Sequence, residues 1–398
     1  MRIALVSVSG QLGGSEAVLL QLVGEINRLR SSWDVRLVSL MEGPLVDRAK
    51  ALDAGVHVVP MPRSVASLGE WGGRRRALGL LSSVATAASD LRVYQRQFSD
   101  ALGAIDPDVV HTNGFKAHVV AARMSTRARR LWHIHEYVSS RPVTRRLLRR
   151  YGSRPDLVVA NSLSVANDVT CVVKGRLRGP VRVIHNGVDL DRFRTEGPAA
   201  DLDAICGLPR AEAGTVRVGL VATFARWKGH DTFLRAMARL DHVPVRGYII
   251  GGALYDTAGS QWSLEQLRAE VDALGLGSRV GFAGFQPDMP AFVRALDVVV
   301  HASNEPEPFG LAILEGMASG KAVVTTGMGG AGEIVEHDRT AVVHAAGDPH
   351  ALAMAIERLA ADAALRARLG SAARAAAEQR FSAARFGEAF VSLYEAMR

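Results

Sequence analysis

Short apolar runs recur along the chain, separated by segments whose apolar residues follow helical spacing. The runs are rich in Val and Ile and nearly continuous, which is typical of parallel strands covered on both faces. In the front half the predicted strands cover residues 2–8, 34–40, 57–61, 108–113, 130–137, 156–162 and 181–187. In the back half they cover residues 216–224, 245–252, 279–285, 297–303, 321–326 and 340–345. The pattern therefore predicts two doubly wound α/β domains.

A stretch between Asn186 and Gly214 separates the two sets of strands. It is polar, carries Gly and Pro and has no sustained period, so we place the domain boundary there. A chain of 398 residues exceeds what one hydrophobic core usually serves, which also favours two domains. We predict a first domain over residues 1–195, a second over 196–380 and a last helix over 381–398.

Two further regions have helical spacing. Residues 68–104 predict a helical insertion in the first domain, because so long a connection between strands is unusual as a loop. The alanine-rich segments 349–381 and 382–397 are amphipathic and predict helices that serve packing rather than chemistry.

Several classes of protein are disfavoured by the composition. No apolar run approaches the roughly 20 residues of a membrane span, and the first residues break into glycines too early for a secretory signal. Cys171 and Cys206 are too few for a disulfide framework and lack partners at zinc-ligand spacing. We expect a cytoplasmic protein without metal or cofactor.

Charge is distributed unevenly. Residues 1–195 carry 29 Lys+Arg against 16 Asp+Glu, whereas the remainder carries 19 against 24, within a net charge of +8. Arginine clusters at Arg74–Arg76 and Arg145–Arg150 suggest contact with an anionic membrane or an acidic acceptor. A basic scaffold that binds nucleic acid or membranes without chemistry is an alternative, but no nucleic-acid motif accompanies the charge.

A glycine turn follows the first predicted strand. Gly10, Gly13 and Gly14 have the order G-x-x-G-G, which differs from the dinucleotide fingerprint G-x-G-x-x-G. The helix start that follows offers free N–H groups and a positive dipole end to an anion. A plain tight turn is the alternative.

Two cations, Arg226 and Lys228, follow the first strand of the second domain at another predicted helix start. Arg offers a bidentate fork and Lys a point charge, so together they suit a diphosphate. A surface lysine at a turn is the alternative, since Lys-Gly alone is a weak signal.

The segment 305–326 places Glu307 and Glu315 on a predicted helix. Pro308 fits the first turn of that helix and Gly320 its end. Eight residues of helix rise roughly 12 Å, more than the about 5 to 9.5 Å between the carboxylates of a glycosidase. The two glutamates therefore have separate tasks: Glu307 could bind a sugar hydroxyl and Glu315 both hydroxyls of a ribose. A helix-surface position is the alternative for Glu315.

These residues resemble a known family. The segment from Glu307 to Val335, together with "FARWKGHD", "VIHNGVDLDRF", "GFQPDMPAFVRALDVVVHAS" and "GGSE", looks like the retaining glycosyltransferases of family 4, which have the GT-B fold. The resemblance covers nearly the whole chain. It implies two Rossmann-like domains, with a nucleotide-sugar donor held mainly by the second, the acceptor by the first, chemistry in the cleft, and a final helix that returns to the first domain.

The resemblance also implies roles for single residues of the second domain. Glu315 would hold the ribose and Lys228 the diphosphate. Glu307 would hold the donor sugar and distal phosphate together with backbone groups, which are those of Phe309, Gly310 and Leu311. The turn after Gly284 would contact the base through Phe285 and Gln286.

In the first domain the resemblance implies three site residues. Gly13 and Gly14 would approach the phosphates or the acceptor from the opposite lobe. His135 stands at the place of the family's cleft histidine, although a structural strand-end residue is the alternative; we interpret His133 as structural. Family members commonly carry an arginine where this chain has Thr223, and Arg226 could substitute for it.

The reaction that the resemblance implies is transfer with retention of the anomeric configuration, by a front-face route and without metal. Uridine is the base favoured by family frequency, with guanosine and adenosine open. The acceptor could be a lipid-linked or cell-envelope precursor, or a soluble natural product or small sugar. An epimerase or phosphorylase on the same architecture is a further alternative.

Overall fold

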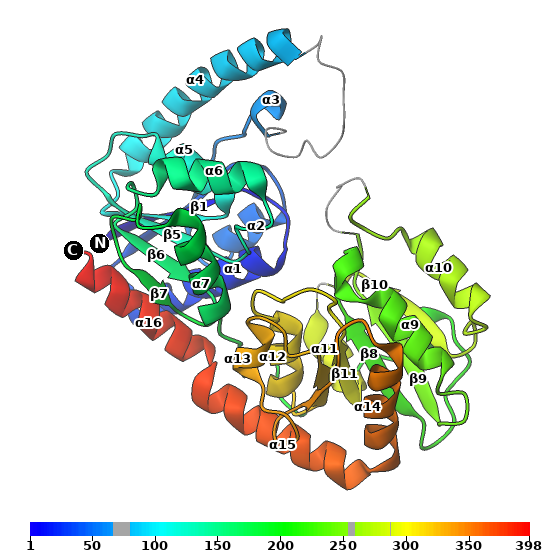
Figure 1. Ribbon diagram of the computed structural model, residues 1–398. Helices are drawn as coiled ribbons and strands as arrows, with labels where there is room; N and C mark the ends of the chain where they lie inside the picture. The colour runs from blue at the N-terminus through cyan, green and yellow to red at the C-terminus, as the bar shows by residue number, and fades with distance from the viewer. Residues whose placement is uncertain (67–79, 254–258, 287) are drawn as a thin grey trace. The chain divides into compact units, whose positions relative to one another are not determined.

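Two compact units make up the chain in the computed structural model, which describes residues 1–66, 80–253, 259–286 and 288–398 (Figure 1). One unit comprises Met1–His185 with Ala383–Arg398, and the other comprises Asn186–Ser382. Each is built on one parallel sheet, so the predicted fold class is confirmed. The predicted cluster Arg74–Arg76 lies outside the described residues. None of the described helices is both long and apolar enough to cross a membrane.

The first unit has a seven-stranded sheet of order β3-β2-β1-β4-β5-β6-β7. Its strands are β1 (Arg2–Ser7), β2 (Asp34–Ser39), β3 (Gly55–Val58), β4 (Val109–Asn113), β5 (Arg129–Ile134), β6 (Leu157–Ala160) and β7 (Val181–Val183). Its helices are α1 (Gly14–Leu29), α2 (Pro44–Lys50), α3 (Arg63–Ala66), α4 (Leu80–Ile105), α5 (Phe115–Ala122), α6 (Pro142–Tyr151), α7 (Leu163–Val173) and α16 (Ala383–Ala396).

The second unit has a six-stranded sheet of order β10-β9-β8-β11-β12-β13. Its strands are β8 (Val216–Val221), β9 (Val245–Ile250), β10 (Val280–Gly284), β11 (Val298–His301), β12 (Ala322–Thr325) and β13 (Val342–Val343). Its helices are α8 (Leu202–Cys206), the 3₁₀ turn η2 (Arg226–Lys228), α9 (His230–Ala238), α10 (Leu264–Ala273), α11 (Met289–Ala295), α12 (Leu311–Ala318), α13 (Ala331–Ile334), α14 (Pro349–Ala361) and α15 (Ala363–Arg380).

Both faces of each sheet are buried, which explains why the strands are nearly continuous in apolar residues. In β11, Val298 and Val300 belong to the core that contains α9 and α14. Val299 belongs to the core on the other face, with α11 and α12. Alternate side chains of a strand point to opposite faces, so a strand covered on both needs apolar residues at every position.

Residues 186–195 group with the second unit rather than with the first, to which the predicted boundary at 195 assigned them. The Val188 N–H donates to the carbonyl of Phe381 at 2.8 Å. Phe193 is buried in the core of the second unit. The second unit therefore begins directly after His185, and the polar stretch that was predicted as a linker belongs to that unit.

Two helical predictions differ from the structure in detail. The insertion of the first unit contains α4, whose Tyr94 and Phe98 are buried against the sheet. Residues 349–381 form two helices instead of one, because the Asp362 carboxylate accepts the Leu365 N–H at 2.8 Å and begins α15. An aspartate at this position starts a new helix rather than continuing the old one.

The last helix returns to the first unit, as the resemblance implies. α16 lies against α1, and the Arg30 guanidinium is 2.8 Å from the Glu395 carboxylate. Tyr394 is fully buried, with its hydroxyl 2.6 Å from Nδ1 of His111. Since His111 lies on β4, this bond connects the end of the chain to the centre of the first sheet.

Histidine rings cluster beside this bond. His111 lies 5.1 Å from His133 between ring centroids, and His133 lies 3.9 Å from His135. Burial lowers the pKa of His111 to about 3, and desolvation by the surrounding atoms lowers that of His135 to about 3. Burial also lowers the pKa of His133 and His118 well below the ordinary value. The cluster is therefore neutral near pH 7.

We expect thermal stability to fall when the pH is lowered from about 7.5 to about 5. The folded rings of His111 and His135 have a pKa of about 3. In the unfolded chain the histidine pKa is about 6.5. The unfolded state therefore binds protons that the folded state does not. The contribution of each neutral ring to the free energy of unfolding is fully present above about pH 6.5. Below that pH it decreases by about 1.4 kcal/mol per pH unit for each ring. Scanning calorimetry at both pH values measures this.

Replacing one ring provides the test of cause. His133→Gln should reduce the fall in Tm between the two pH values, whatever its effect on Tm itself. The matched control is His242→Gln at an exposed position, where hydrogen bonds to Glu357 and Asp241 raise the histidine pKa. A His133→Gln protein whose Tm falls as steeply as that of the wild type would contradict the explanation.

Candidate functional site

The strand order of the second unit places a switch point between β8 and β11. β8 and β11 pair in parallel, while the chain continues from β8 to β9 on one side and from β11 to β12 on the other. Open parallel sheets bind ligands at the carboxyl ends of the strands that flank such a point. η2 follows β8, and residues 302–310 follow β11. Several predicted site residues lie in these two connections.

Lys228 and Glu307 form an ion pair across these connections. Nζ of Lys228 is 2.5 Å from Oε2 of Glu307, and the two side chains are only 17% and 10% exposed. Gly229 permits the approach, since its φ is +74° and a Cβ there would lie 1.9 Å from the Ala302 carbonyl oxygen. No other residue type fits this contact without moving the backbone. The Lys-Gly pair of the sequence is therefore a structural requirement for the ion pair.

His301 and Ser303 also contact Oε2 of Glu307. Nε2 of His301 lies 2.8 Å from that oxygen and the Ser303 hydroxyl donates to it at 3.1 Å. Because a carboxylate only accepts, Nε2 carries the proton. Nδ1 then accepts from the hydroxyl of Thr325, 3.2 Å away on β12. The orientation of Glu307 is thus set by a chain of hydrogen bonds that reaches two strands.

Strand alternation explains why His301 points to Glu307. Val299 faces the core around α12, so His301, two residues further on, faces the same side of the sheet. His301 is 3% exposed and Ser303 is fully buried. Neither was predicted from the sequence, although the parity of the apolar residues in "DVVVHAS" is a signal that could have identified His301.

Charge compensation keeps Glu307 ionised. Burial alone would raise the pKa of Glu307, but the Lys228 ammonium and the hydrogen bond from His301 outweigh it and hold the pKa well below its usual range. A buried carboxylate without these partners would neutralise instead. The site therefore holds a fixed negative charge paired with a cation.

The backbone of Glu307 lies outside the helix that the sequence predicts for it. Its N–H donates to Met328 at 3.1 Å and its carbonyl accepts from Gly330 at 2.7 Å, so it pairs with the loop after β12. α12 begins at Leu311, with Gly310 as its N-cap at φ +101°. The predicted start at Pro308 is wrong, and the helical rise over eight residues does not describe the separation of the two glutamates.

The start of α12 offers hydrogen-bond donors. The first N–H groups of a helix have no partner within it. Those of Gly310, Leu311 and Ala312 have no acceptor within the part of the chain that the structure describes. The Phe309 side chain is 2% exposed and its ring packs against that of Phe381. Only the backbone of Phe309 could therefore contact a ligand, as predicted for residues 309–311.

Glu315 occupies the middle of α12 and is partly exposed. Its neighbours Ile313, Leu314 and Met317 are fully buried. Burial raises the pKa of the Glu315 carboxyl to about 7, against a smaller opposite effect of Arg192. A carboxyl with this pKa changes its charge near neutral pH.

The side chain of Arg226 contacts Trp262 and Gln266. Its guanidinium lies 3.9 Å from the centroid of the Trp262 ring and 3.5 Å from Oε1 of Gln266 on α10. It is exposed. Thr223, where family members commonly carry an arginine, stands between β8 and η2. Arg226 stacks on Trp262.

The turn after β10 carries Phe285 and Gln286. Gly284 adopts φ +71°, which favours glycine, and ends the strand. Phe285 is 53% exposed, an unusual position for a large aromatic ring. Gln286 donates a hydrogen bond to the Ala283 carbonyl. An aromatic face is thus available at the carboxyl end of the second sheet.

In the first unit, Gly13 is the N-cap of α1 and Gly14 its first residue. Glu16, which sequence reasoning did not single out, is 6% exposed there. Burial raises its pKa, in spite of hydrogen bonds from Ser15 and from the backbone of Glu16 and Gly13. This carboxyl takes up donors that an anion would otherwise use at the helix start.

His135 directly follows β5, at the carboxyl end of the first sheet. Its Nε2 is buried without a hydrogen-bond partner among the described residues. The Asn161 side chain donates to its carbonyl at 3.4 Å. The neutral ring can therefore offer either a donor or an acceptor to a ligand. His133, two residues earlier on β5, is buried in the cluster of histidine rings.

In the ranges that the structure describes, no group of three or more His, Cys, Asp or Glu side chains could hold a metal ion.

Comparison with known proteins identifies both halves of the chain. Residues 12–192 match a protein-family model described as Glycosyltransferase Family 4, and residues 211–376 match one described as Glycosyl transferases group 1.

Two curated relatives illustrate the sequence similarity. A lipopolysaccharide core biosynthesis mannosyltransferase LpcC of Rhizobium leguminosarum is 35% identical over 56% of this chain and 61% of its own length. A D-inositol 3-phosphate glycosyltransferase of Streptomyces avermitilis is 32% identical over 56% of this chain and 48% of its own length. The matched parts thus span about half to three fifths of these relatives.

Solved structures match over the whole length. The Anabaena protein Alr3699/HepE, determined in complex with UDP and glucose, is 26% identical, with a TM-score of 0.80 and 99% of both chains covered. The same protein in complex with UDP-glucose gives a TM-score of 0.78 over 100% of both chains. With two parallel-sheet units that both match, the chain belongs to glycosyltransferase family 4, with the GT-B fold.

Proposed function

We propose that this chain is a retaining glycosyltransferase that moves a sugar from a nucleotide-diphosphate sugar to an acceptor hydroxyl. The observation that carries the proposal is the buried Lys228–Glu307 pair, 2.5 Å apart, at the switch point of the second sheet. A fixed cation beside the open start of α12 suits a diphosphate. UDP is the preferred donor nucleotide, because a relative of 26% identity was solved with UDP and with UDP-glucose.

In this proposal the donor is bound by groups of the second unit. Lys228 and the N–H groups at the start of α12 contact the diphosphate, while Glu307 accepts from hydroxyls of the sugar. Glu315 accepts from the ribose hydroxyls, and Phe285 stacks on the base. The aromatic ring of Phe285 is exposed enough to do so. Arg226, held on Trp262, has no direct part unless its stacking is released.

Transfer would proceed by a front-face route. The departing diphosphate takes the proton of the acceptor hydroxyl while the new glycosidic bond forms on the face that the leaving group vacates. Lys228 and the helix N–H groups stabilise the charge that develops on the phosphate, in the manner of preorganised electrostatic catalysis. Because these groups supply positive charge, we propose that no metal is required.

The acceptor side belongs to the first unit in this proposal. His135 and the start of α1 at Gly13 and Gly14 would contact the acceptor. A lipid-linked or cell-envelope precursor is the preferred class, since the name of one relative refers to lipopolysaccharide core biosynthesis. A small phosphorylated acceptor is the second class, since that of another refers to D-inositol 3-phosphate. We place the reaction in the cytoplasm.

Glu315 should make nucleotide affinity depend on pH. Its pKa is about 7, so the carboxylate that accepts from a ribose is lost as the pH falls. The affinity for UDP should therefore decrease about tenfold from about pH 8 to about pH 6. Titration calorimetry with wild type and Glu315→Gln measures this, since the phosphate titrates equally in both. Glu305→Gln, at an exposed neighbour, is the matched control. Equal pH dependence in wild type and Glu315→Gln would remove Glu315 from the ribose site.

Glu307→Gln should act mainly on turnover. Loss of one preorganised charge costs about 10² to 10³ in kcat, whereas UDP affinity should change little because UDP lacks the transferred sugar that Glu307 would contact. Hydrolysis or transfer from a donor panel of UDP-, GDP- and ADP-sugars measures kcat, and calorimetry measures affinity. An unchanged kcat would exclude Glu307 from catalysis.

His301→Gln should shift the pH profile of the same reaction. The hydrogen bond from His301 helps to hold the pKa of Glu307 low, so its loss raises that pKa. The acid limb of the kcat profile should therefore move to higher pH, which mere structural damage would not cause. His350→Gln, exposed on α14, is the control. A lower kcat with an unshifted acid limb would show that His301 does not position Glu307.

Activity should survive chelation, and the product should keep the anomeric configuration of the donor. Lys228 and the α12 N–H groups supply the charge that a metal would otherwise supply. Transfer assays with and without EDTA, followed by NMR of the new linkage, measure both. Loss of turnover that a divalent ion restores would contradict metal independence. Nucleotide-sugar epimerised without transfer would support an epimerase instead.

A further inference from the structure

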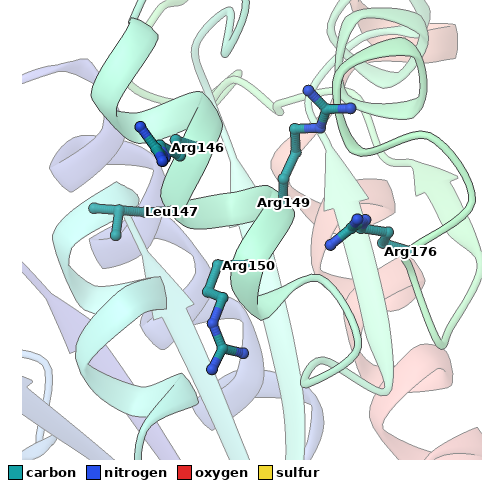
Figure 2. Close-up of a pocket in the computed structure, with 5 residues that line it drawn as sticks. All are labelled: Arg146, Leu147, Arg149, Arg150 and Arg176. Atoms are coloured by element: carbon teal, nitrogen blue, oxygen red, sulfur yellow. The ribbon is translucent and has the colours of Figure 1, made fainter.

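Arginines are concentrated on the exposed surface of α6. Arg146, Arg149 and Arg150 of α6 and Arg176 in the turn after α7 border a hollow of about 370 Å³ (Figure 2). All four side chains are exposed. In the described residues none of them has a carboxylate within ion-pair distance, whereas Arg141, at the start of α6, pairs with Glu136 at 2.5 Å. We call these four residues the arginine face.

A close backbone contact brings Arg176 to the other three. At Gly152, directly after α6, a Cβ would lie 2.7 Å from Cγ1 of Val173 and 3.2 Å from the Arg176 carbonyl oxygen. The glycine therefore lets the end of α6 approach the turn that carries Arg176. Four like charges held together repel one another, and a negatively charged partner relieves this repulsion.

Aliphatic side chains lie beside the arginines on the same helix. Val143 is 54% exposed and Leu147 37% exposed, and their spacing of four puts them on one side of α6. Leu148, by contrast, is fully buried in the core with α7. A helix surface with exposed aliphatic groups beside arginines fits the boundary between lipid headgroups and acyl chains.

The directions of the side chains favour an extended partner. In Figure 2, Arg149 and Arg150 project from α6 in opposite directions, and Arg146 projects to a third side. A single phosphate would be held by guanidinium groups that converge on it. Diverging groups instead contact separate anions spread over a surface.

We propose that the arginine face, with Val143 and Leu147, docks on a bilayer that contains anionic phospholipid. Phosphodiester headgroups would contact the guanidinium groups, and the two aliphatic side chains would enter the headgroup region. The inference deepens the proposed function, since it names the surface from which a lipid-linked acceptor would be taken. Vesicle binding requires no sugar transfer, so either proposal can fail while the other holds.

Flotation of the full chain with vesicles tests the proposal. The protein should float with phosphatidylcholine vesicles that contain about 30% phosphatidylglycerol and remain behind with pure phosphatidylcholine at low salt. The double variant Arg146→Gln/Arg150→Gln should reduce the partition coefficient about tenfold or more. Leu147→Ser should reduce the binding that survives at about 0.5 M salt, where charge is screened.

The control removes the same charge elsewhere on the first unit. Arg92 and Arg96 are exposed on α4, have the same spacing and lie beside Val93, which is 54% exposed. Arg92→Gln/Arg96→Gln should float within about twofold of the wild type, since α6 carries the binding. UDP affinity should be unchanged in both double variants, which shows that the second unit is intact in each.

Three outcomes would overturn the proposal. The first is that the wild type does not float with anionic vesicles at low salt. The second is an equal loss in both double variants, which would show that net charge rather than α6 attracts the protein. The third is release from the vesicles by millimolar glycerol phosphate, which would show that the arginine face holds a single phosphate group. If UDP does not bind but flotation still depends on the arginines of α6, the proposed function is wrong and the docking surface is supported.

Discussion

One buried ion pair, Lys228 with Glu307, sets the arrangement of the second unit's site. Removing two charges from water costs several kcal/mol for each ion, so both need well-placed partners. The close contact at Gly229 brings the ammonium in, and Ser303 and His301 occupy the remaining positions around Oε2. The backbone of Glu307 is held by the loop after β12. Each of these features serves to compensate one carboxylate in a place that water does not reach freely.

The first unit also buries polar side chains, but these are uncharged. Polar rings gather at the carboxyl end of its sheet, where His111, His133 and His135 are in contact. Their pKa values fall so far that the rings stay neutral. Tyr394, from the far end of the chain, gives His111 its hydrogen-bond partner. The final helix is therefore needed for the centre of the first sheet, although it follows the whole second unit in the sequence.

Much of the architecture follows from local patterns. Apolar residues at every position of a strand indicate burial on both faces, and the strands predicted in this way occur in both units. The sequence also predicted the end of α12 correctly. Gly320, which adopts φ +67°, follows the last turn of that helix as expected. The start of that helix was misjudged. Pro308 is compatible with a first turn, yet Glu307 pairs with Gly329 in the loop after β12, and the helix does not begin until Leu311.

What the sequence by itself determined is the set of candidate residues: the Lys-Gly turn, the two glutamates, the aromatic turn after β10 and the arginines of α6. Their spacing along the chain follows from the alternation of strands and turns, which is a property of the local sequence. Only the tertiary structure decided their partners. Lys228 meets Glu307 across 79 positions of sequence, and Arg226 stacks on Trp262 instead of joining them. These contacts depend on which strands become neighbours in the sheet and on how closely a glycine lets two turns approach. A single sequence motif does not contain either piece of information.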